Sequence, residues 1–233
     1  MKMKVYSLVL LFVCSLSFYA QKSLSVDDIF TKRMFASKFA SGFKAMKNGI
    51  HYTDIIKDST GIYIAKFDLK TGNKLANIVN ANNVKVDGKQ IDINDYTFSS
   101  DESKILFKTG VEGIYRRSSK AQCFVYNVKT GATTELSANG KQMFATFSPK
   151  GNKVAFVRDN NMFIKDLDSN NETQITFDGK NNEIKNGWAD WVYEEEFSKA
   201  DYFEWNADGS KLAYVKFNES KVKEYSFDQY NNN

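Results

Sequence analysis

The sequence predicts an all-β protein of the β-propeller type, because two short motifs recur along the chain at intervals that fit one blade each. The first motif superimposes without a gap in residues 98–107 (FSSDESKILF), 147–156 (FSPKGNKVAF) and 205–214 (WNADGSKLAY). Each copy holds an aromatic residue, a polar turn, a lysine and a short apolar strand whose first and third residues share one face. The motif therefore predicts the same strand–turn–strand hairpin three times.

A second motif lies out of phase with the first and supplies another turn for each unit. It is found in residues 67–72 (FDLKTG), 126–131 (YNVKTG) and 165–170 (KDLDSN). Gly72 and Gly131 provide the positive φ that tight hairpins use, and Asn170 tolerates the same backbone region. Each copy is expected to end one strand and begin another.

The spacing of the first motif favours a propeller with about four blades, an incomplete ring. Its copies begin 49 and then 58 residues apart, which accommodates four short strands with their turns. Propellers typically close with four to eight blades. A sandwich of short strands is the alternative architecture.

Helices are expected at only two places. Ser25, followed by Asp27 and Asp28, predicts the capped start of a short N-terminal helix within a helical or irregular segment over residues 21–48. A second helical turn is expected at residues 192–198. Residues 49–233 form the predicted partial propeller, and residues 222–227 are interpreted as a strand within it.

Residues 1–20 are predicted to be a secretory signal peptide. Lys2 and Lys4 precede an apolar run that ends at Ala20, the order found in such signals. Export to the periplasm or the cell exterior is therefore expected, with an uncleaved membrane anchor as the alternative. Removal of this segment also removes Cys14, leaving Cys123, whose apolar neighbours predict a buried strand thiol.

Composition excludes several classes of function. The 233 residues include 42% hydrophobic and 15% aromatic residues, which is incompatible with a disordered chain. The single histidine, His51, excludes histidine-rich metal sites, and neither a GxSxG elbow nor a phosphate-binding glycine loop occurs. Without residues 1–20, which hold two lysines and no acid, the formal net charge falls from +4 to +2. Neither nucleic acid nor an anionic membrane is implied as a partner.

The densest chemical signal is the acidic run of residues 190–196 (DWVYEEE). Three consecutive carboxylates beside large aromatic residues repel one another and favour a cationic ligand. Glu195 and Glu196 can reach one ligand only if the chain turns helically there, at about 100° per residue. The alternative is a solvated acidic turn, stabilised by the helix dipole or paired with Lys185 and Lys199.

This run closely resembles the double-glutamate motif of the dipeptidyl peptidase IV family, serine exopeptidases that release N-terminal dipeptides with proline or alanine second. Residues 147–156 are similar to the family's blade segment upstream of that motif, and residues 211–220 to the segment downstream. Residues 115–118 (YRRS) resemble its arginine-bearing strand. The likeness covers roughly residues 50 to 230, and residues 190–196 are its most specific part.

The resemblance implies three substrate-binding residues. Glu195 and Glu196 would bind the free N-terminal ammonium of a peptide, with Glu194 as a framework residue. Arg116 would donate hydrogen bonds to a substrate carbonyl oxygen, a role suited to a permanently charged guanidinium. Arg117 is the alternative if the register differs by one residue, and a surface ion pair is the alternative for either arginine.

The chain also departs from the family pattern. In the family an eight-bladed propeller precedes an α/β-hydrolase domain with the Ser, Asp and His, and this sequence contains no such domain. The chain is therefore expected to have no catalytic residues, cofactor or metal of its own and to be inactive alone, as a truncated or partial sequence. Its expected partners are a peptide with a free N-terminus and the missing hydrolase domain; the resemblance also allows a homodimer of the full-length protein.

Two readings of function remain open at the level of sequence. In the first, the chain is the substrate-recognition propeller of a secreted serine-type dipeptidyl aminopeptidase. In the second, it is a non-enzymatic propeller that binds peptides or partner proteins, since the fold alone decides no function. An inactive remnant is a third and weaker reading.

Overall fold

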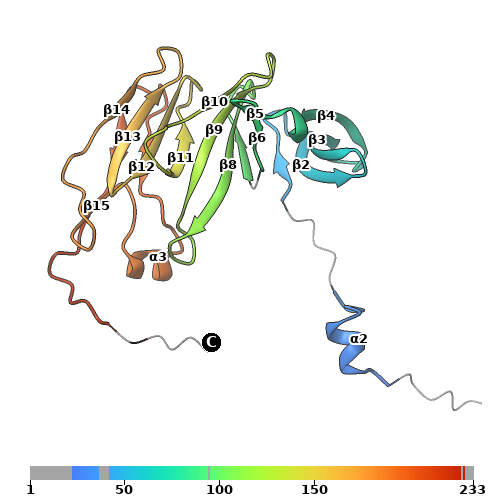
Figure 1. The fold of residues 1–233 in the computed structure, drawn as a ribbon, viewed down its shortest axis with the longest axis horizontal. Helices are drawn as coiled ribbons and strands as arrows, with labels where there is room; N and C mark the ends of the chain where they lie inside the picture. The colour runs from blue at the N-terminus through green and yellow to red at the C-terminus, as the bar shows by residue number, and fades with distance from the viewer. Residues whose placement is uncertain (1–22, 37–41, 94, 227, 229–233) are drawn as a thin grey trace, which may run out of the picture. The chain divides into compact units, whose positions relative to one another are not determined.

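Four-stranded antiparallel sheets dominate the computed structural model of the chain, which describes residues 23–36, 42–93, 95–226 and 228 (Figure 1). The chain divides into two units, Met1–Ser41 and Gly42–Asn233. The predicted signal peptide, residues 1–20, lies outside the described residues. No helix among the described residues is long and apolar enough to span a membrane.

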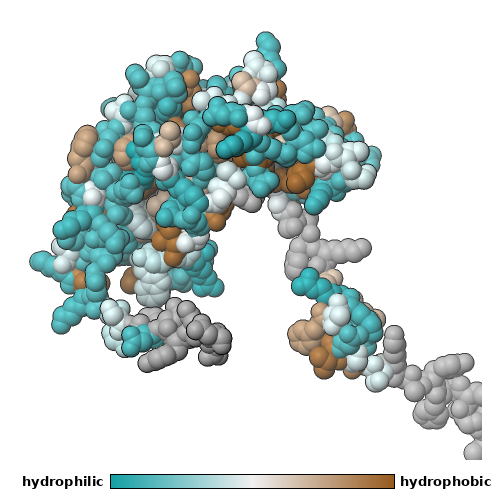
Figure 2. Space-filling view, viewed as in Figure 1, coloured by the Kyte–Doolittle hydropathy of each residue, from teal (hydrophilic) through white to brown (hydrophobic). Residues whose placement is uncertain are grey.

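Among its described residues, the first unit contains one short helix, α2 (Val26–Phe30). Its start is the predicted one, because Ser25 and Asp28 form a capping box. The Ser25 hydroxyl accepts a hydrogen bond from the Asp28 N–H at 3.0 Å, and the Asp28 carboxylate accepts one from the Ser25 N–H at 3.1 Å. Val26, Ile29 and Phe30 are exposed on this helix and form an apolar patch (Figure 2).

The second unit begins with three sheets of four strands each, in chain order. The first consists of β1 (Lys44–Ala45), β2 (His51–Asp58), β3 (Gly61–Asp68) and β4 (Lys74–Asn80). The second consists of β7 (Asp95–Phe98), β8 (Lys104–Gly113), β9 (Ser119–Asn127) and β10 (Thr133–Glu135). The third consists of β11 (Met143–Phe147), β12 (Lys153–Arg158), β13 (Asn161–Asp166) and β14 (Glu172–Gln174). A short 3₁₀ turn, η1 (Ala81–Asn83), and a hairpin of β5 (Lys85–Val86) and β6 (Lys89–Gln90) link the first two sheets.

A fourth group of strands follows and carries an inserted helix. Its elements are β15 (Ile184–Asn186), α3 (Trp191–Phe197), β16 (Phe203–Trp205), β17 (Leu212–Tyr214) and β18 (Lys216–Asn218). The outer strands pair as β15 with β18, and the inner ones pair as β16 with β17. Helix α3 covers the helical turn that the sequence predicted at residues 192–198.

Both sequence motifs form the turns expected of them. In the first motif, the residue after the aromatic donates its backbone N–H to the backbone carbonyl of the motif's lysine. The three bonds run from Ser99 to Lys104 at 2.9 Å, from Ser148 to Lys153 at 2.8 Å and from Asn206 to Lys211 at 3.0 Å. In the second motif, Gly72, Gly131 and Asn170 all have positive φ, between 59° and 73°. The first motif thus marks the turn between the first and second strands in the second and third sheets and the β16–β17 turn in the fourth group. The second motif marks the turn between the third and fourth strands of the first three sheets.

The hydrophobic core lies between successive sheets. Strands with alternating apolar residues contribute to two clusters at once: Ile105 and Phe107 of β8 face the first sheet, whereas Leu106 faces the third. On β12, Val154 and Phe156 face the second sheet, and Ala155 and Val157 pack with Trp188 and Phe203 of the fourth group. Sheets stacked face to face in chain order are the blades of a propeller. The predicted fold class is therefore confirmed, as an open series of blades that forms no closed ring in the described part (Figure 1).

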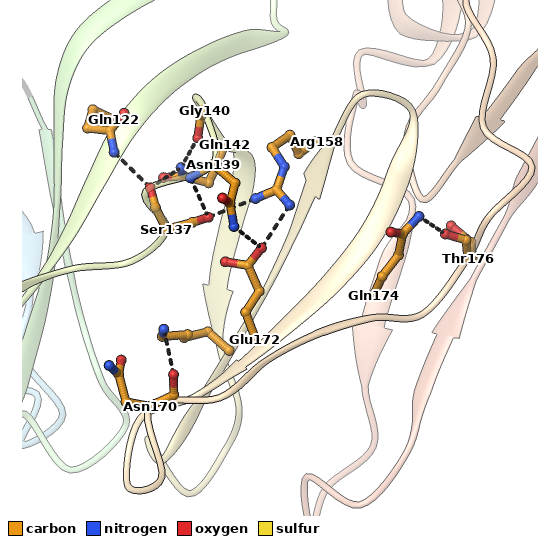
Figure 3. Close-up of polar contacts among 11 residues, drawn as sticks. Gln122, Ser137, Asn139, Gly140, Gln142, Arg158, Asn170, Glu172, Gln174 and Thr176 are labelled. Carbon is orange, nitrogen blue, oxygen red and sulfur yellow. Dashed lines mark hydrogen bonds and ion pairs between the residues drawn. The ribbon is translucent and has the colours of Figure 1, made fainter.

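A buried polar cluster joins the second and third blades (Figure 3). Arg158 of β12 donates to the Ser137 hydroxyl at 2.7 Å and to the Glu172 carboxylate at 2.7 Å. Its guanidinium also lies 4.0 Å from the ring centroid of Phe163. Ser137 follows the last strand of the second blade, and Glu172 lies on the last strand of the third. We call Arg158, Glu172 and Ser137 the interblade clamp.

The strand expected at residues 222–227 is not formed over its described part. Residues 222–226 adopt no strand, and Phe227 lies outside the described residues. The apolar and aromatic residues there match a strand pattern, but a strand also needs a neighbour with which to exchange backbone hydrogen bonds. The described sheets offer none to this segment, and Val222 is 68% exposed.

Candidate functional site

The second blade has a hairpin that is longer than those of its neighbours. Strands β8 and β9 extend past the sheet, and their turn, residues 114–118, contains both candidate arginines. The Ile114 N–H donates to the Ser118 carbonyl at 2.9 Å, and the Tyr115 N–H donates to the Ser118 hydroxyl at 3.2 Å. We call residues 114–118 the hairpin tip. It reaches helix α3 of the fourth blade (Figure 1).

Helix α3 is short, with a side-chain cap at its start and a left-handed residue at its end. Asp190 caps its N-terminus, because its carboxylate accepts a hydrogen bond from the Tyr193 N–H at 2.8 Å. Ser198 ends the helix in the left-handed region, at φ 56°. Tyr193 packs edge-to-face on Phe217 of β18, with the ring centroids 4.9 Å apart. The helix is therefore held against its own blade.

Glu194 connects the helix to the hairpin tip. Its side chain is completely buried, and Oε1 accepts hydrogen bonds from the backbone N–H groups of Arg117 at 2.5 Å and Ser118 at 2.8 Å. Hydrogen bonds to an ionised carboxylate are stronger than neutral ones. Oε2 is also buried and accepts no hydrogen bond from the described residues. This geometry gives Glu194 a framework role in holding the tip in place.

Arg116 and Glu195 meet across the same junction. Arg116 Nη1 lies 3.3 Å from Glu195 Oε2, with the arginine side chain 70% exposed and the glutamate side chain 23% exposed. Arg117, the alternative in register, donates instead to the Ser198 hydroxyl at 2.9 Å, at the end of the helix. The side chain that reaches Glu195 is thus that of Arg116 and not that of Arg117.

Glu196 follows on the next position of the helix and is exposed. Its carboxylate has neither a hydrogen bond nor an ion pair among the described residues. Successive helical positions differ by about 100° in direction, so Glu195 and Glu196 occupy adjacent rather than opposite sides of α3. The lysines considered as alternative partners for the acidic run bind elsewhere: Lys185 pairs with Glu219 at 2.5 Å and Lys199 with Asp201 at 3.2 Å.

The charges at this junction leave a net negative site. Arg116 balances one carboxylate, and the other remains without a cation. One oxygen of the Glu194 carboxylate already accepts hydrogen bonds from two backbone N–H groups. The exposed carboxylate of Glu196 can therefore attract an additional positive charge beside the Arg116–Glu195 pair.

Comparison with known proteins agrees with this architecture. The sequence model of a protein family, the dipeptidyl peptidase IV (DPP IV) N-terminal region, matches residues 99–233, more than half of the chain. The chain belongs to the dipeptidyl peptidase IV family. Within the family, it is similar to a crystal structure of Porphyromonas gingivalis dipeptidyl peptidase 4, with a TM-score of 0.78 and 38% identity over 88% of this chain and 29% of that one.

Curated relatives show the same partial coverage. The chain is 30% identical over 216 residues to a probable dipeptidyl-aminopeptidase B of Pyrenophora teres, which covers 88% of this chain and 24% of the relative. It is 38% identical over 139 residues to dipeptidyl peptidase 4 of Felis catus, covering 58% of this chain and 18% of the relative. The chain thus spans about a quarter or less of the length of these relatives and matches their propeller region.

Some residues of the junction have no signal in the sequence. Ser198 is ordinary in its local context, and it takes part only because the hairpin tip and α3 meet. Tyr115 and Ser118 belong to the arginine-bearing stretch and Lys185 was a candidate partner of the acidic run, but the sequence does not indicate the contacts that they make here. Arg116, Glu195 and Glu196 were identified through the family motif. The contact between Arg116 and Glu195 is observed, whereas the role of all three residues toward a substrate stays a prediction.

Proposed function

We propose that this chain recognises the N-terminus of peptide substrates for a serine-type dipeptidyl aminopeptidase. The observation that supports the proposal is the ion pair of Arg116 and Glu195 at 3.3 Å, beside the unpaired Glu196 and fixed by Glu194. This pair joins two segments that are 79 residues apart in the chain. The family relatives are dipeptidyl aminopeptidases, which is the activity to which such a site belongs.

In this proposal the substrate's ammonium completes the charge balance of the site. Glu195 and Glu196 accept its N–H groups, and Arg116 donates to a carbonyl oxygen of the bound peptide. Since the chain end is fixed, only the second peptide bond comes within reach of a serine in the hydrolase domain of the full-length gene product. Dipeptides with proline or alanine second are the products expected from the family.

A blocked amine tests the proposal directly. The full-length gene product is assayed with a chromogenic Gly-Pro conjugate and with its N-acetylated form. Acetylation removes the positive charge, so turnover should be lost for the blocked substrate. Comparable turnover of the two substrates refutes the amine site.

Matched variants test the two carboxylates. Glu195→Gln and Glu196→Gln each remove a charge-assisted hydrogen bond of about 1.5–3 kcal/mol, which corresponds to a loss of roughly tenfold or more in kcat/KM. Glu204→Gln, at an exposed position on β16, is the control and should behave as the unmodified protein. An equal effect of all three changes contradicts the assignment.

We also propose that the protein is exported through residues 1–20, as the sequence pattern suggests. N-terminal sequencing of the protein from the periplasm or culture medium tests this. A start near Gln21 is expected, whereas an intact Met1 in a membrane fraction supports the anchor instead.

A further inference from the structure

Lys185 is a buried cation beside the candidate site. It lies on β15, and only 4% of its side chain is exposed. Its ammonium lies 2.5 Å from Glu219 Oε1, just beyond β18, and the Glu219 side chain is 13% exposed. Removing two charges from water carries a desolvation penalty that frequently exceeds their mutual attraction. Stability alone is therefore a weak reason for this pair.

The same ammonium also contacts two aromatic rings. Nζ is 4.5 Å from the ring centroid of Trp188 and 5.6 Å from that of Tyr115. The two rings stack on each other, with centroids 6.5 Å apart and an interplanar angle of 24°. A cation within about 6 Å of an aromatic ring centroid is attracted to the ring, and more strongly where water is excluded. Lys185 thereby links β15 and Glu219 to the hairpin tip.

Tyr115 directly precedes Arg116 in the tip. Glu194 holds the tip on the other side of Arg116, through the N–H groups of Arg117 and Ser118. Glu194 accepts no hydrogen bond from Tyr115 or Arg116. Arg116 is thus fixed between two attachments, one at Tyr115 and one at Arg117 and Ser118.

We infer that Lys185 is a positioning residue: its ammonium holds Tyr115 against Trp188 and so places Arg116 opposite Glu195. The inference rests on the proposed function, because Arg116 is the group whose position matters to a substrate. If Lys185 served only to join β15 to the end of β18, its contact with the ring of Tyr115 would not be needed. That end of the strand pair is also closed by a backbone hydrogen bond, from the Glu219 N–H to the Glu183 carbonyl at 2.7 Å.

The first test compares Lys185→Met with Lys199→Met in the full-length gene product, using the free-amine Gly-Pro conjugate. Lys199 is the control, since it too pairs with a carboxylate and lies 5.8 Å from a tyrosine ring, that of Tyr202, which is not a residue of the hairpin tip. We expect Lys185→Met to raise KM about three- to tenfold with kcat changed less than twofold, and Lys199→Met to change neither. An unchanged KM in Lys185→Met overturns the inference.

Tyr115→Leu provides a variant that leaves the buried ion pair intact. It removes the ring from an exposed turn, so folding should survive even if Lys185→Met leaves Glu219 uncompensated and fails to fold. The same rise in KM is expected. A normal KM for Tyr115→Leu overturns the inference regardless of how Lys185→Met behaves.

A double-mutant cycle with Arg116→Met separates positioning from other effects. If Lys185 acts through Arg116, Lys185→Met should add no further rise in KM once Arg116 is absent. Independent, multiplying effects overturn the inference.

The cycle also separates this inference from the proposed function. If Arg116→Met leaves KM unchanged, the role of Arg116 in the proposed function fails. Amide hydrogen exchange of residues 114–118 then decides the inference: faster exchange in Tyr115→Leu supports the attachment of the tip, and unchanged exchange overturns it.

Discussion

Glu194 accepts a hydrogen bond at 2.8 Å from the backbone N–H of Ser118, a residue 76 positions earlier in the chain. This bond joins the hairpin tip of the second blade to the helix of the fourth. It also separates the roles of the three consecutive glutamates: Glu194 points into the protein, whereas Glu195 and Glu196 remain accessible. The acidic run is therefore one structural residue followed by two that can meet a ligand.

Glu194→Gln should destabilise the protein more than the same change at Glu196. The first variant weakens two charge-assisted hydrogen bonds, one of them from the buried Ser118 N–H, which corresponds to about 1–3 kcal/mol. Glu196 has no partner among the described residues, so its change should remain within about 0.5 kcal/mol. Urea unfolding of the full-length gene product measures both. Equal midpoints contradict the framework role of Glu194.

Breaking the interblade clamp on one side should destabilise the protein strongly. Glu172→Leu leaves Arg158, with a side chain only 10% exposed, without its carboxylate, and such a change typically lowers the free energy of unfolding by about 3–5 kcal/mol. The double variant Arg158→Met/Glu172→Leu removes both charges and should be less destabilised than the single one. Thermal unfolding compares them. A double variant that is worse than Glu172→Leu contradicts this account.

The thiol of Cys123 should be inert in the folded protein. It is 1% exposed on β9, and burial raises its pKa to about 12. At pH 8 it is therefore protonated as well as inaccessible, and a thiol reagent should label it only after unfolding. The variant Cys14→Ser, assayed in parallel, restricts the signal to Cys123. Rapid labelling under native conditions contradicts the burial.

The same pKa shift gives a pH dependence of stability. The thiol in the unfolded chain ionises near pH 9, whereas the folded one stays protonated until about pH 12. Between these values the unfolded state binds fewer protons, so the free energy of unfolding falls as pH rises. Cys123→Ala should remove this contribution. Stability curves of the two proteins from pH 8 to 11 should therefore converge as the pH increases.

Gly187→Ala should disturb the contact between the third and fourth blades. Gly187 has φ +79°, and an added Cβ would lie 2.8 Å from the sulfur of Met162 on β13. Gly88 is a matched control, since its φ is +77° and no atom lies within 4 Å of the added group. Both changes incur backbone strain, but only Gly187→Ala adds overpacking, typically about 1–3 kcal/mol. Equal losses in thermal stability contradict the close approach.

The sequence predicted the local part of this structure well. Ser99, Ser148 and Asn206 each begin the expected turn, and Ser25 begins the expected N-terminal helix, because these features depend on residues only a few positions apart. The same local reasoning failed at residues 222–226, where a strand-like pattern has no partner strand. Local pattern gives a strand its propensity, but only tertiary structure gives it a neighbour.

The candidate site was predictable only through family resemblance, and then only in part. Arg116, Glu195 and Glu196 stand in a recognisable motif. The contacts that hold these residues in place belong to no recognisable motif. The Glu194–Ser118 hydrogen bond and the Lys185–Tyr115 contact each join segments separated by about 70 residues or more. Nothing in either segment alone specifies the other.

The hairpin tip spans the third blade to reach the fourth, and Ile114 packs on the cluster between those two blades. The tip therefore connects three consecutive modules. The hydrophobic clusters, in contrast, each lie between two adjacent modules. Any change in the tilt of one module against the next would alter the separation of Arg116 from Glu195. The separation of these two side chains is thus set by the curvature of the array from the second blade to the fourth.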